Sequence, residues 1–270
     1  MPGVDDESLT VSVAGRVARL TLAVPTMGAA FFRELPRAVR ALDADPGVRA
    51  IVVTGADGRF SYGLDLRSMS GTFTEVMTDG SAAARSAFLA EVRELQAAIT
   101  ALADCRTPTV AAIAGWCVGG GIDLAAAADV RLASADARFS VREVRMAIVA
   151  DLGSLQRLVG VVGDGHLREL ALTGADIGAA RAERIGLVND VYADEAALLA
   201  AADTLAGAMA ANSPLVTRGI KDVLDAERGP RVEAGLRYVA AWNAAFLPSA
   251  DLGEALTAFR ERRDPEFRGA

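Results

Sequence analysis

Three carboxylates in this 270-residue sequence lie next to apolar segments, where burying a charged group costs free energy unless it is paired or functional. Asp123 is in GGGIDLAAAA, Glu143 is in SVREV, and Asp151 is in MAIVADLGSLQRL, eight residues after Glu143. Burial raises the pKa of a carboxyl group toward neutrality, which suits a group that must both take and give protons. The three residues are therefore candidates for general acid–base catalysis.

Each carboxylate also has an ordinary structural explanation. Asp123 falls in the first turn of an expected helix, where the helix dipole favours any negative charge. Glu143 is flanked by Arg142 and Arg145 and could form an ion pair on a solvated turn. Asp151 could cap the helix that we expect to begin near Gly153. Taken alone, none of the three establishes a site.

Two glycine turns provide a second chemical feature. FSYGLDL (Phe60–Leu66) and WCVGGGIDL (Trp116–Leu124) each read as a strand, a glycine turn and a following helix. Glycine lets the backbone approach a ligand closely, and the first N–H groups of a helix have no partner within it. Two such turns side by side could direct two N–H groups at one oxygen, although each could also be a simple connection. We expect Asp65 to cap the helix after its own turn.

Several other chemistries lack the residues that they need. His166 is the only histidine and Cys105 and Cys117 are the only cysteines, so a zinc site is not expected and no HExxH is present. The sequence contains no GxSxG elbow and no GxxxxGK[ST] loop. Leu124 occupies the position where a dinucleotide fingerprint requires its last glycine. We therefore expect no metal and place His166 on the surface.

Composition limits the partners and the compartment. Hydrophobic residues make up 52% and charged residues 23% of the chain, with a net charge of −7. A negative balance argues against nucleic acid or an anionic membrane as the partner, and no apolar run is long enough for a membrane span. The first residues lack the pattern of a signal or transit peptide. Two cysteines do not make a disulfide framework, so we expect a reducing compartment and a cytoplasmic location.

Hydrophobic periodicity predicts an α/β core followed by helices. A hairpin is expected over Leu9–Val24, and strands and helices alternate as far as about Val191. From Glu195 onward the pattern is helical only. We therefore divide the chain into a core of residues 1–194, with the candidate site, and a helical region of residues 195–270. The clearest expected elements are Phe31–Leu42, Arg49–Gly55, Ala82–Ala103, Pro108–Gly115, Glu195–Ala211, Pro214–Glu227, Arg231–Phe246 and Leu252–Arg262.

The ordered motifs resemble those of the enoyl-CoA hydratase/isomerase (crotonase) superfamily. The resemblance rests on FSYGLDL, AGWCVGGGIDLAAAADVRLAS, FSVREV and LGSLQRLVG, in this order and spacing. It implies a spiral core of ββα units with a helical C-terminal trimerisation region, assembled as a homotrimer or homohexamer. It also implies an acyl-CoA thioester as the substrate, so that coenzyme A enters with the substrate and no separate cofactor is expected. The implied oxyanion hole consists of the Leu64 and Gly120 N–H groups, and the implied substrate contacts are Tyr62, Gly63 and Gly119.

Within that superfamily the acids distinguish the activities. Hydratases resemble this chain at Asp123 and Glu143 but generally have glycine-rich sequence where Asp151 lies. Δ3,5-Δ2,4-dienoyl-CoA isomerases carry all three acids, and the resemblance is closest to them. We therefore predict a dienoyl-CoA isomerase with catalytic Asp123, Glu143 and Asp151. The alternatives are a 2-enoyl-CoA hydratase of fatty-acid β-oxidation and a non-catalytic CoA-binding or RNA-binding member.

Overall fold

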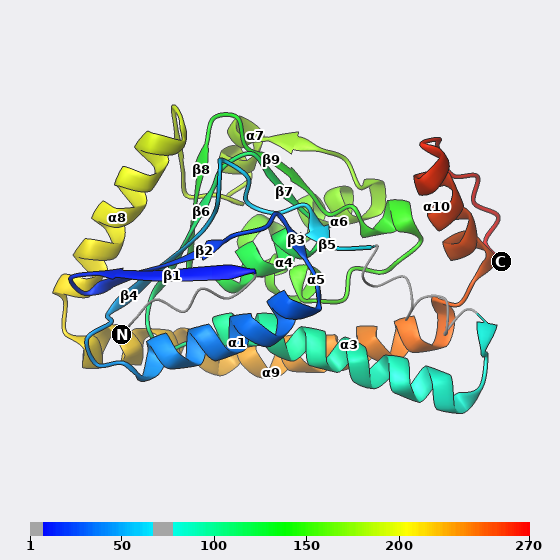
Figure 1. Ribbon diagram of the computed structural model, residues 1–270, viewed down its shortest axis with the longest axis horizontal. Helices are drawn as coiled ribbons and strands as arrows, with labels where there is room; N and C mark the ends of the chain where they lie inside the picture. The colour runs from blue at the N-terminus through cyan, green and yellow to red at the C-terminus, as the bar shows by residue number, and fades with distance from the viewer. Residues whose placement is uncertain (1–7, 67–77) are drawn as a thin grey trace.

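A six-stranded sheet runs through the middle of the molecule in the computed structural model, which describes residues 8–66 and 78–270 (Figure 1). The first two strands in the sheet form the predicted antiparallel hairpin, and all other neighbours are parallel. The central strands β4 and β6 are buried along their whole length, as expected of parallel strands covered on both faces. The spatial order is β1 (Leu9–Ala14), β2 (Val17–Leu22), β4 (Ala50–Gly55), β6 (Thr109–Ile113), β8 (Val130–Ser134) and β11 (Asp190–Tyr192).

A second set of short strands lies beyond the carboxyl ends of the long ones. β3 pairs with β5, Ser61 next to β5 forms a bridge with Cys117 of β7, and β7 continues the pairing to β9 and β10. A long strand, a short strand and a helix thus recur along the chain, which confirms the expected ββα units. The helix expected directly after Leu66, with Asp65 as its cap, lies outside the described residues. The short strands are β3 (Thr26–Met27), β5 (Gly63–Leu64), β7 (Trp116–Val118), β9 (Arg138–Ser140) and β10 (Ile177–Gly178).

Helices cover both faces of the large sheet. On one face α8 lays an alanine-rich stripe, centred on Ala202 and Ala206, against Ala50 and Val52 of β4. The alternate residues of β4, Ile51 and Val53, belong to the larger core on the other face. The helices are α1 (Ala29–Ala44), α3 (Ala82–Ala103), α4 (Gly120–Ala127), η1 (a 3-10 turn, Glu143–Met146), α5 (Ser154–Arg157), α6 (Val159–Thr173), α7 (Ala179–Arg184), α8 (Glu195–Ala211), α9 (Pro214–Phe246) and α10 (Ala250–Glu261).

One expectation about the C-terminal region is wrong. The sequence predicts two helices, Pro214–Glu227 and Arg231–Phe246, whereas the structure has the single 33-residue helix α9 with Pro230 inside it. Proline removes one intrahelical hydrogen bond and disfavours the preceding turn. Here α9 packs along α3, as Figure 1 shows. Ion pairs hold it on both sides of the proline, Asp222 with Arg106 before it and Glu233 with Arg93 after it. Tertiary packing therefore outweighs the local signal for a break.

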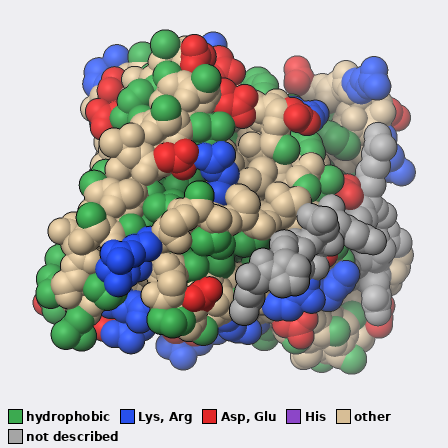
Figure 2. All heavy atoms as spheres, turned by 60° about the vertical axis from the view of Figure 1, so that its left-hand side comes forward, with side chains coloured by type: hydrophobic (Ala, Val, Ile, Leu, Met, Phe, Trp, Pro, Cys, Tyr) green, Lys and Arg blue, Asp and Glu red, His purple; other side chains and the backbone are tan. Residues whose placement is uncertain are grey.

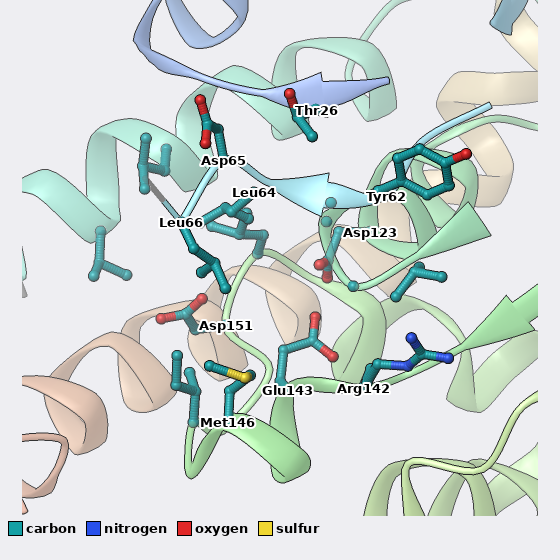
Figure 3. A pocket seen from close by; sticks show the side chains of 18 of the residues that line it. Thr26, Tyr62, Leu64, Asp65, Leu66, Asp123, Arg142, Glu143, Met146 and Asp151 are labelled. Carbon is teal, nitrogen blue, oxygen red and sulfur yellow. The ribbon is translucent and has the colours of Figure 1, made fainter. Parts of the chain in front are cut away.

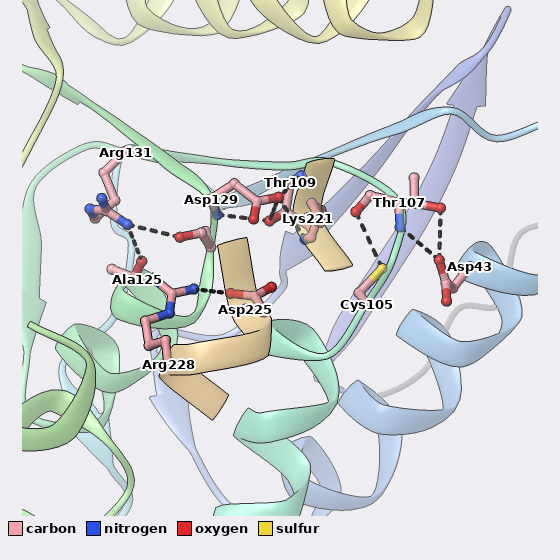
Figure 4. Close-up of polar contacts among 11 residues, drawn as sticks. Asp43, Cys105, Thr107, Thr109, Ala125, Asp129, Arg131, Lys221, Asp225 and Arg228 are labelled. Atoms are coloured by element: carbon pink, nitrogen blue, oxygen red, sulfur yellow. Dashed lines mark hydrogen bonds and ion pairs between the residues drawn. The ribbon is translucent and has the colours of Figure 1, made fainter. Parts of the chain in front are cut away.

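A buried ion pair fastens the first half of α9 to the sheet (Figure 4). Lys221 Nζ lies 2.7 Å from Asp129 Oδ2, and the Lys221 side chain is only 9% exposed. The same oxygen accepts the N–H and hydroxyl hydrogen bonds of Thr109 at 2.7 and 2.9 Å. The neighbouring pair between Arg106 and Asp222 is about half exposed on both sides. Both ion pairs join α9 to the core, but the charges of the Lys221 pair are far less exposed to solvent than those of the Arg106 pair.

Replacing Lys221 by Met should destabilise the protein, because it leaves the Asp129 carboxylate half-buried without its cation. Loss of one partner of a buried pair costs about 3–5 kcal/mol, and since Asp129 keeps some solvent contact we expect the lower end of that range. The matched control, Arg106→Met, removes a solvent-exposed pair and should cost less than about 1 kcal/mol. Urea unfolding of both variants measures the two losses. Equal losses would contradict this role of Lys221.

One face of the molecule shows no single dominant character. The face in Figure 2 carries hydrophobic, basic and acidic side chains side by side. His166 is exposed, as predicted from the sequence. Across residues 8–66 and 78–270, no helix combines the length and apolarity needed to cross a bilayer, and no cluster of three His, Cys, Asp or Glu side chains could hold a metal ion.

Candidate active site

A cavity of about 750 Å³ opens where the short strands meet the C-terminal helices (Figure 3). Its walls are mainly apolar, and they come from segments far apart in the chain. All eight residues that the sequence predicted for the site line this one cavity, namely Tyr62, Gly63, Leu64, Gly119, Gly120, Asp123, Glu143 and Asp151. The apolar wall includes Leu66, Phe88, Val92, Val118, Met146, Ile148, Leu152, Leu247 and Phe259.

The two glycine turns touch each other backbone to backbone. Gly63 has φ +84°, and a Cβ at this position would lie 2.8 Å from the Val118 carbonyl oxygen and 3.1 Å from the Gly120 nitrogen. Any larger residue would push the turns apart. This approach brings the two backbone segments named in the sequence prediction to one edge of the cavity.

The hydrogen-bond pattern gives the direction of the two N–H groups. Asp65 donates its N–H to the Met27 carbonyl of β3. Because consecutive N–H groups of an extended strand point to opposite edges, the Leu64 N–H is directed away from β3, toward the second turn. Gly120 is the first residue of α4, so its N–H has no acceptor within the helix. Two backbone donors thus face the same region of the cavity.

Asp123 is the most deeply buried of the three acids, with 1% of its surface exposed. Its Oδ1 accepts the Ser154 N–H at 2.5 Å, while Oδ2 is buried without a hydrogen-bond partner among the described residues. Burial raises the pKa of Asp123, whereas the Ser154 hydrogen bond and the charge of buried Arg157 oppose that rise. Asp123 is therefore the acid whose surroundings most favour the ionised form.

Glu143 opens the 3-10 turn η1 and points its carboxylate at the second glycine turn. A Cβ on Gly119 would lie 3.4 Å from Glu143 Oε1, and Oε2 is buried with no partner in the described part of the chain. The pairing with Arg142 that the sequence left open does not form, since Arg142 pairs with Asp176 and lies over the Trp116 ring. Burial, and then the charges of Asp123 and Asp151, raise the pKa of Glu143.

Asp151 lines the same cavity as Glu143, in the segment that leads into α5 (Figure 3). It does not cap that helix, whose N-cap is Gly153, and the Ser154 N–H belongs to Asp123 instead. The partner of Asp151 is Asn243 of α9, which donates to Oδ2 at 2.7 Å. Burial raises the pKa of Asp151 to about 7; the Asn243 hydrogen bond lowers it, and the charge of Asp123 adds to the rise.

Sequence reasoning missed the buried polar residues that support the acids. These are Gln96, Ser154, Arg157 and Asn243, each less than 5% exposed. For Asn243 a signal existed, because it falls on the apolar stripe of α9 formed by Leu236, Val239, Ala240 and Ala244. A lone amide in such a stripe indicates a buried partner. No comparable pattern distinguished Ser154, whose backbone N–H donates to Asp123.

The arrangement of backbone N–H groups and carboxyl groups suits acid–base chemistry next to a carbonyl group. Backbone N–H groups at a glycine turn can stabilise negative charge on an oxygen, and the carboxyl groups with raised pKa values that line the same apolar cavity can move protons. Buried carboxylate oxygens without partners, on Asp123 and Glu143, are the feature expected where a bound group completes the hydrogen bonding. The site suits proton transfer at carbon next to a carbonyl whose enolate is stabilised.

Comparisons with known proteins agree with this geometry. The enoyl-CoA hydratase/isomerase family profile matches residues 13–270. The chain is 44% identical to the peroxisomal Δ(3,5)-Δ(2,4)-dienoyl-CoA isomerase of Arabidopsis thaliana, over 88% of this chain and 86% of that protein. It is 32% identical to a probable enoyl-CoA hydratase of Mycobacterium bovis, over 97% and 98% of the two chains.

A solved structure of a family member has the same fold. The enoyl-CoA hydratase/isomerase from Pseudoalteromonas atlantica superposes with a TM-score of 0.82 at 25% identity, covering 97% of this chain and all of that one. The chain therefore belongs to the enoyl-CoA hydratase/isomerase family and has its crotonase fold, as the motifs predicted.

Proposed function

We propose that this protein is a Δ3,5-Δ2,4-dienoyl-CoA isomerase. The observation that carries the proposal is the third acid, Asp151, which lines the same apolar cavity as Asp123 and Glu143. The similarity to the Arabidopsis thaliana isomerase supports it. The reaction moves the double bonds of a 3,5-dienoyl-CoA to positions 2 and 4, by loss of a proton at C2 and gain of a proton at C6.

The backbone donors serve the thioester end of the substrate in this proposal. The Leu64 and Gly120 N–H groups hold the thioester oxygen and stabilise the negative charge that develops when C2 loses its proton. Each donor of an oxyanion hole is typically worth roughly 3–4 kcal/mol in the transition state. Tyr62, Gly63 and Gly119 form the wall around that end, and the neighbouring glycines allow the close approach.

The two proton transfers belong to Glu143 and Asp151. C2 and C6 are four carbons apart, so one carboxyl group does not serve both ends easily. Glu143 borders the second glycine turn, and Asp151 lines the same cavity next to Asn243 of α9, so two separate acids are available for the two ends. Asp123 accepts the Ser154 N–H and raises the pKa values of the other two acids by its charge. Its proposed role is to orient and tune them.

The Asp151→Asn variant should lose isomerisation and retain acyl-CoA binding. General acid–base catalysis contributes about 10²- to 10⁴-fold, and we expect kcat for a 3,5-dienoyl-CoA to fall by that factor. An ultraviolet assay of diene conjugation measures the rate, and calorimetric titration with a saturated acyl-CoA measures binding. Asp104→Asn is the control, because Asp104 also has a raised pKa but lies outside this cavity.

Full turnover by the Asp151→Asn variant would remove Asp151 from the mechanism. The same assay run with a 2-enoyl-CoA tests the alternative, in which Asp123 and Glu143 hold a water for hydration. Rapid hydration of the enoyl-CoA by the unmodified protein, with no isomerisation of the dienoyl-CoA, would replace the isomerase proposal by the hydratase.

The assembly and compartment are further parts of the proposal. The helix α9 exposes large apolar side chains that a subunit contact would cover, among them Leu215, Val223, Leu224 and Tyr238. We expect a homotrimer or homohexamer, with a mass by light scattering of three or six times the 28.0 kDa of the chain. A monomeric mass would contradict it. The cytoplasmic location and a place in fatty-acid β-oxidation stay predictions.

A further inference from the structure

Asn243 is a buried amide that connects the C-terminal helix to the proposed proton-transfer site. It lies on α9 and is 2% exposed. Its Nδ2 donates to the Val149 carbonyl oxygen at 2.9 Å and to Asp151 Oδ2 at 2.7 Å. The two acceptors lie two residues apart in the segment between η1 and α5. One side chain thus holds both the backbone and the carboxyl group of that segment.

The chemistry of the amide settles which of its ends faces Asp151. A backbone carbonyl can only accept hydrogen bonds, so the NH₂ group of Asn243, and not its oxygen, must face Val149. The second hydrogen of the same NH₂ group then points at Asp151. A donor in this position favours the ionised carboxylate over the neutral acid. It also leaves Oδ1 as the oxygen that carries a proton when the group is protonated.

We propose that Asn243 is the positioning residue for Asp151, holding Oδ2 so that Oδ1 is presented to the substrate for proton transfer. The proposal deepens the isomerase function and rests on it. Asn243 comes from the region of residues 195–270, so this helical region contributes to the catalytic geometry as well as to packing.

A second amide provides a comparison within the same segment. Gln96 of α3 is 1% exposed, and its Nε2 donates to the backbone carbonyls of Asp151 at 2.7 Å and Leu236 at 3.0 Å. Gln96 therefore holds the main chain of residue 151 and ties it to α9, but it makes no contact with the carboxyl group. A variant of Gln96 measures the effect of loosening the segment without removing the donor to Oδ2.

The electrostatic surroundings support the role of the donor. The Asn243 hydrogen bond opposes the burial and the Asp123 charge that raise the pKa of Asp151. Loss of that donor therefore moves the pKa of Asp151 upward, whichever end of the substrate Asp151 serves. Among residues 8–66 and 78–270, the other charged groups lining the cavity are Asp65 after β5, Glu91 of α3, Asp123 of α4, and Arg142, Glu143 and Arg145 around η1.

The test compares Asn243→Leu with Gln96→Met in the pH dependence of kcat for the 3,5-dienoyl-CoA. A hydrogen bond to a charged group is worth enough to shift a pKa by about one unit. We expect Asn243→Leu to move one limb of the profile up by about one pH unit and to lower kcat at pH 7 about tenfold. Gln96→Met should lower the melting temperature and leave both limbs in place.

The proposal would be overturned if a folded Asn243→Leu variant had the same pH profile of kcat as the unmodified protein. It would also be overturned if Gln96→Met shifted that profile by an equal amount. If the leucine variant does not fold, Asn243→Ala removes the same donor without introducing another hydrogen-bonding group or a larger side chain, and is read by the same criteria.

A direct titration separates this proposal from the isomerase function. Carbon-13 labelling of aspartate carboxyl groups, with Asp151→Asn to assign the signal, gives the pKa of Asp151 without any turnover. A higher pKa in the Asn243 variant supports the contact even if the protein does not isomerise dienoyl-CoA, in which case only the proposed function fails. An unchanged pKa overturns the role of Asn243 even in an active enzyme.

Discussion

The constraint on which the site depends is the placement of three carboxyl groups around one apolar cavity, with Asp123 buried and Glu143 and Asp151 half-buried. Such groups are costly to keep ionised away from water, and for two of the three a specific partner limits that cost. Asp123 has the Ser154 N–H and the nearby charge of Arg157, and Asp151 has Asn243. Glu143 has the least compensation, with one oxygen buried and unpaired. The raised pKa values that would serve proton transfer follow from this distribution of partners.

The fold builds the cavity from segments that are far apart in the sequence. Parallel strands and their short continuations bring the two glycine turns together, and the contact between Gly63 and Val118 leaves no room for a side chain. The helix α3, with Leu247 after α9 and Phe259 of α10, closes the other side of the cavity. Two buried amides, one on α3 and one on α9, hold the Asp151 segment. The buried Lys221–Asp129 pair fastens α9 to the sheet. The C-terminal helices therefore complete the cavity that the strand ends begin.

Patterns over short stretches of the sequence predicted helix bounds and the motifs that form the site. The bounds of α3 and α8 coincide with the prediction, and the family resemblance carried by the ordered glycine turns and acids located the cavity-lining residues. The continuity of α9 through Pro230 was missed, because tertiary packing decides it. The partner of Asp151 was missed for the same reason: Asn243 is 92 residues away, and only the fold brings the two side chains together. Long-range pairs of this kind leave little trace in one sequence beyond a polar residue on an apolar stripe.

The pH dependence of stability, compared between the unmodified protein and Asp151→Asn, tests the central claim most directly. With its pKa raised to about 7 in the folded state, against roughly 3.9 in an unfolded chain, Asp151 binds a proton on folding between those values. Stability should therefore fall as the pH rises through this window, and the asparagine variant should lack that part of the fall. We predict that the variant gains stability relative to the unmodified protein from about pH 4 to pH 7, with a constant difference above. A difference that is independent of pH would show that Asp151 titrates normally and would contradict the account.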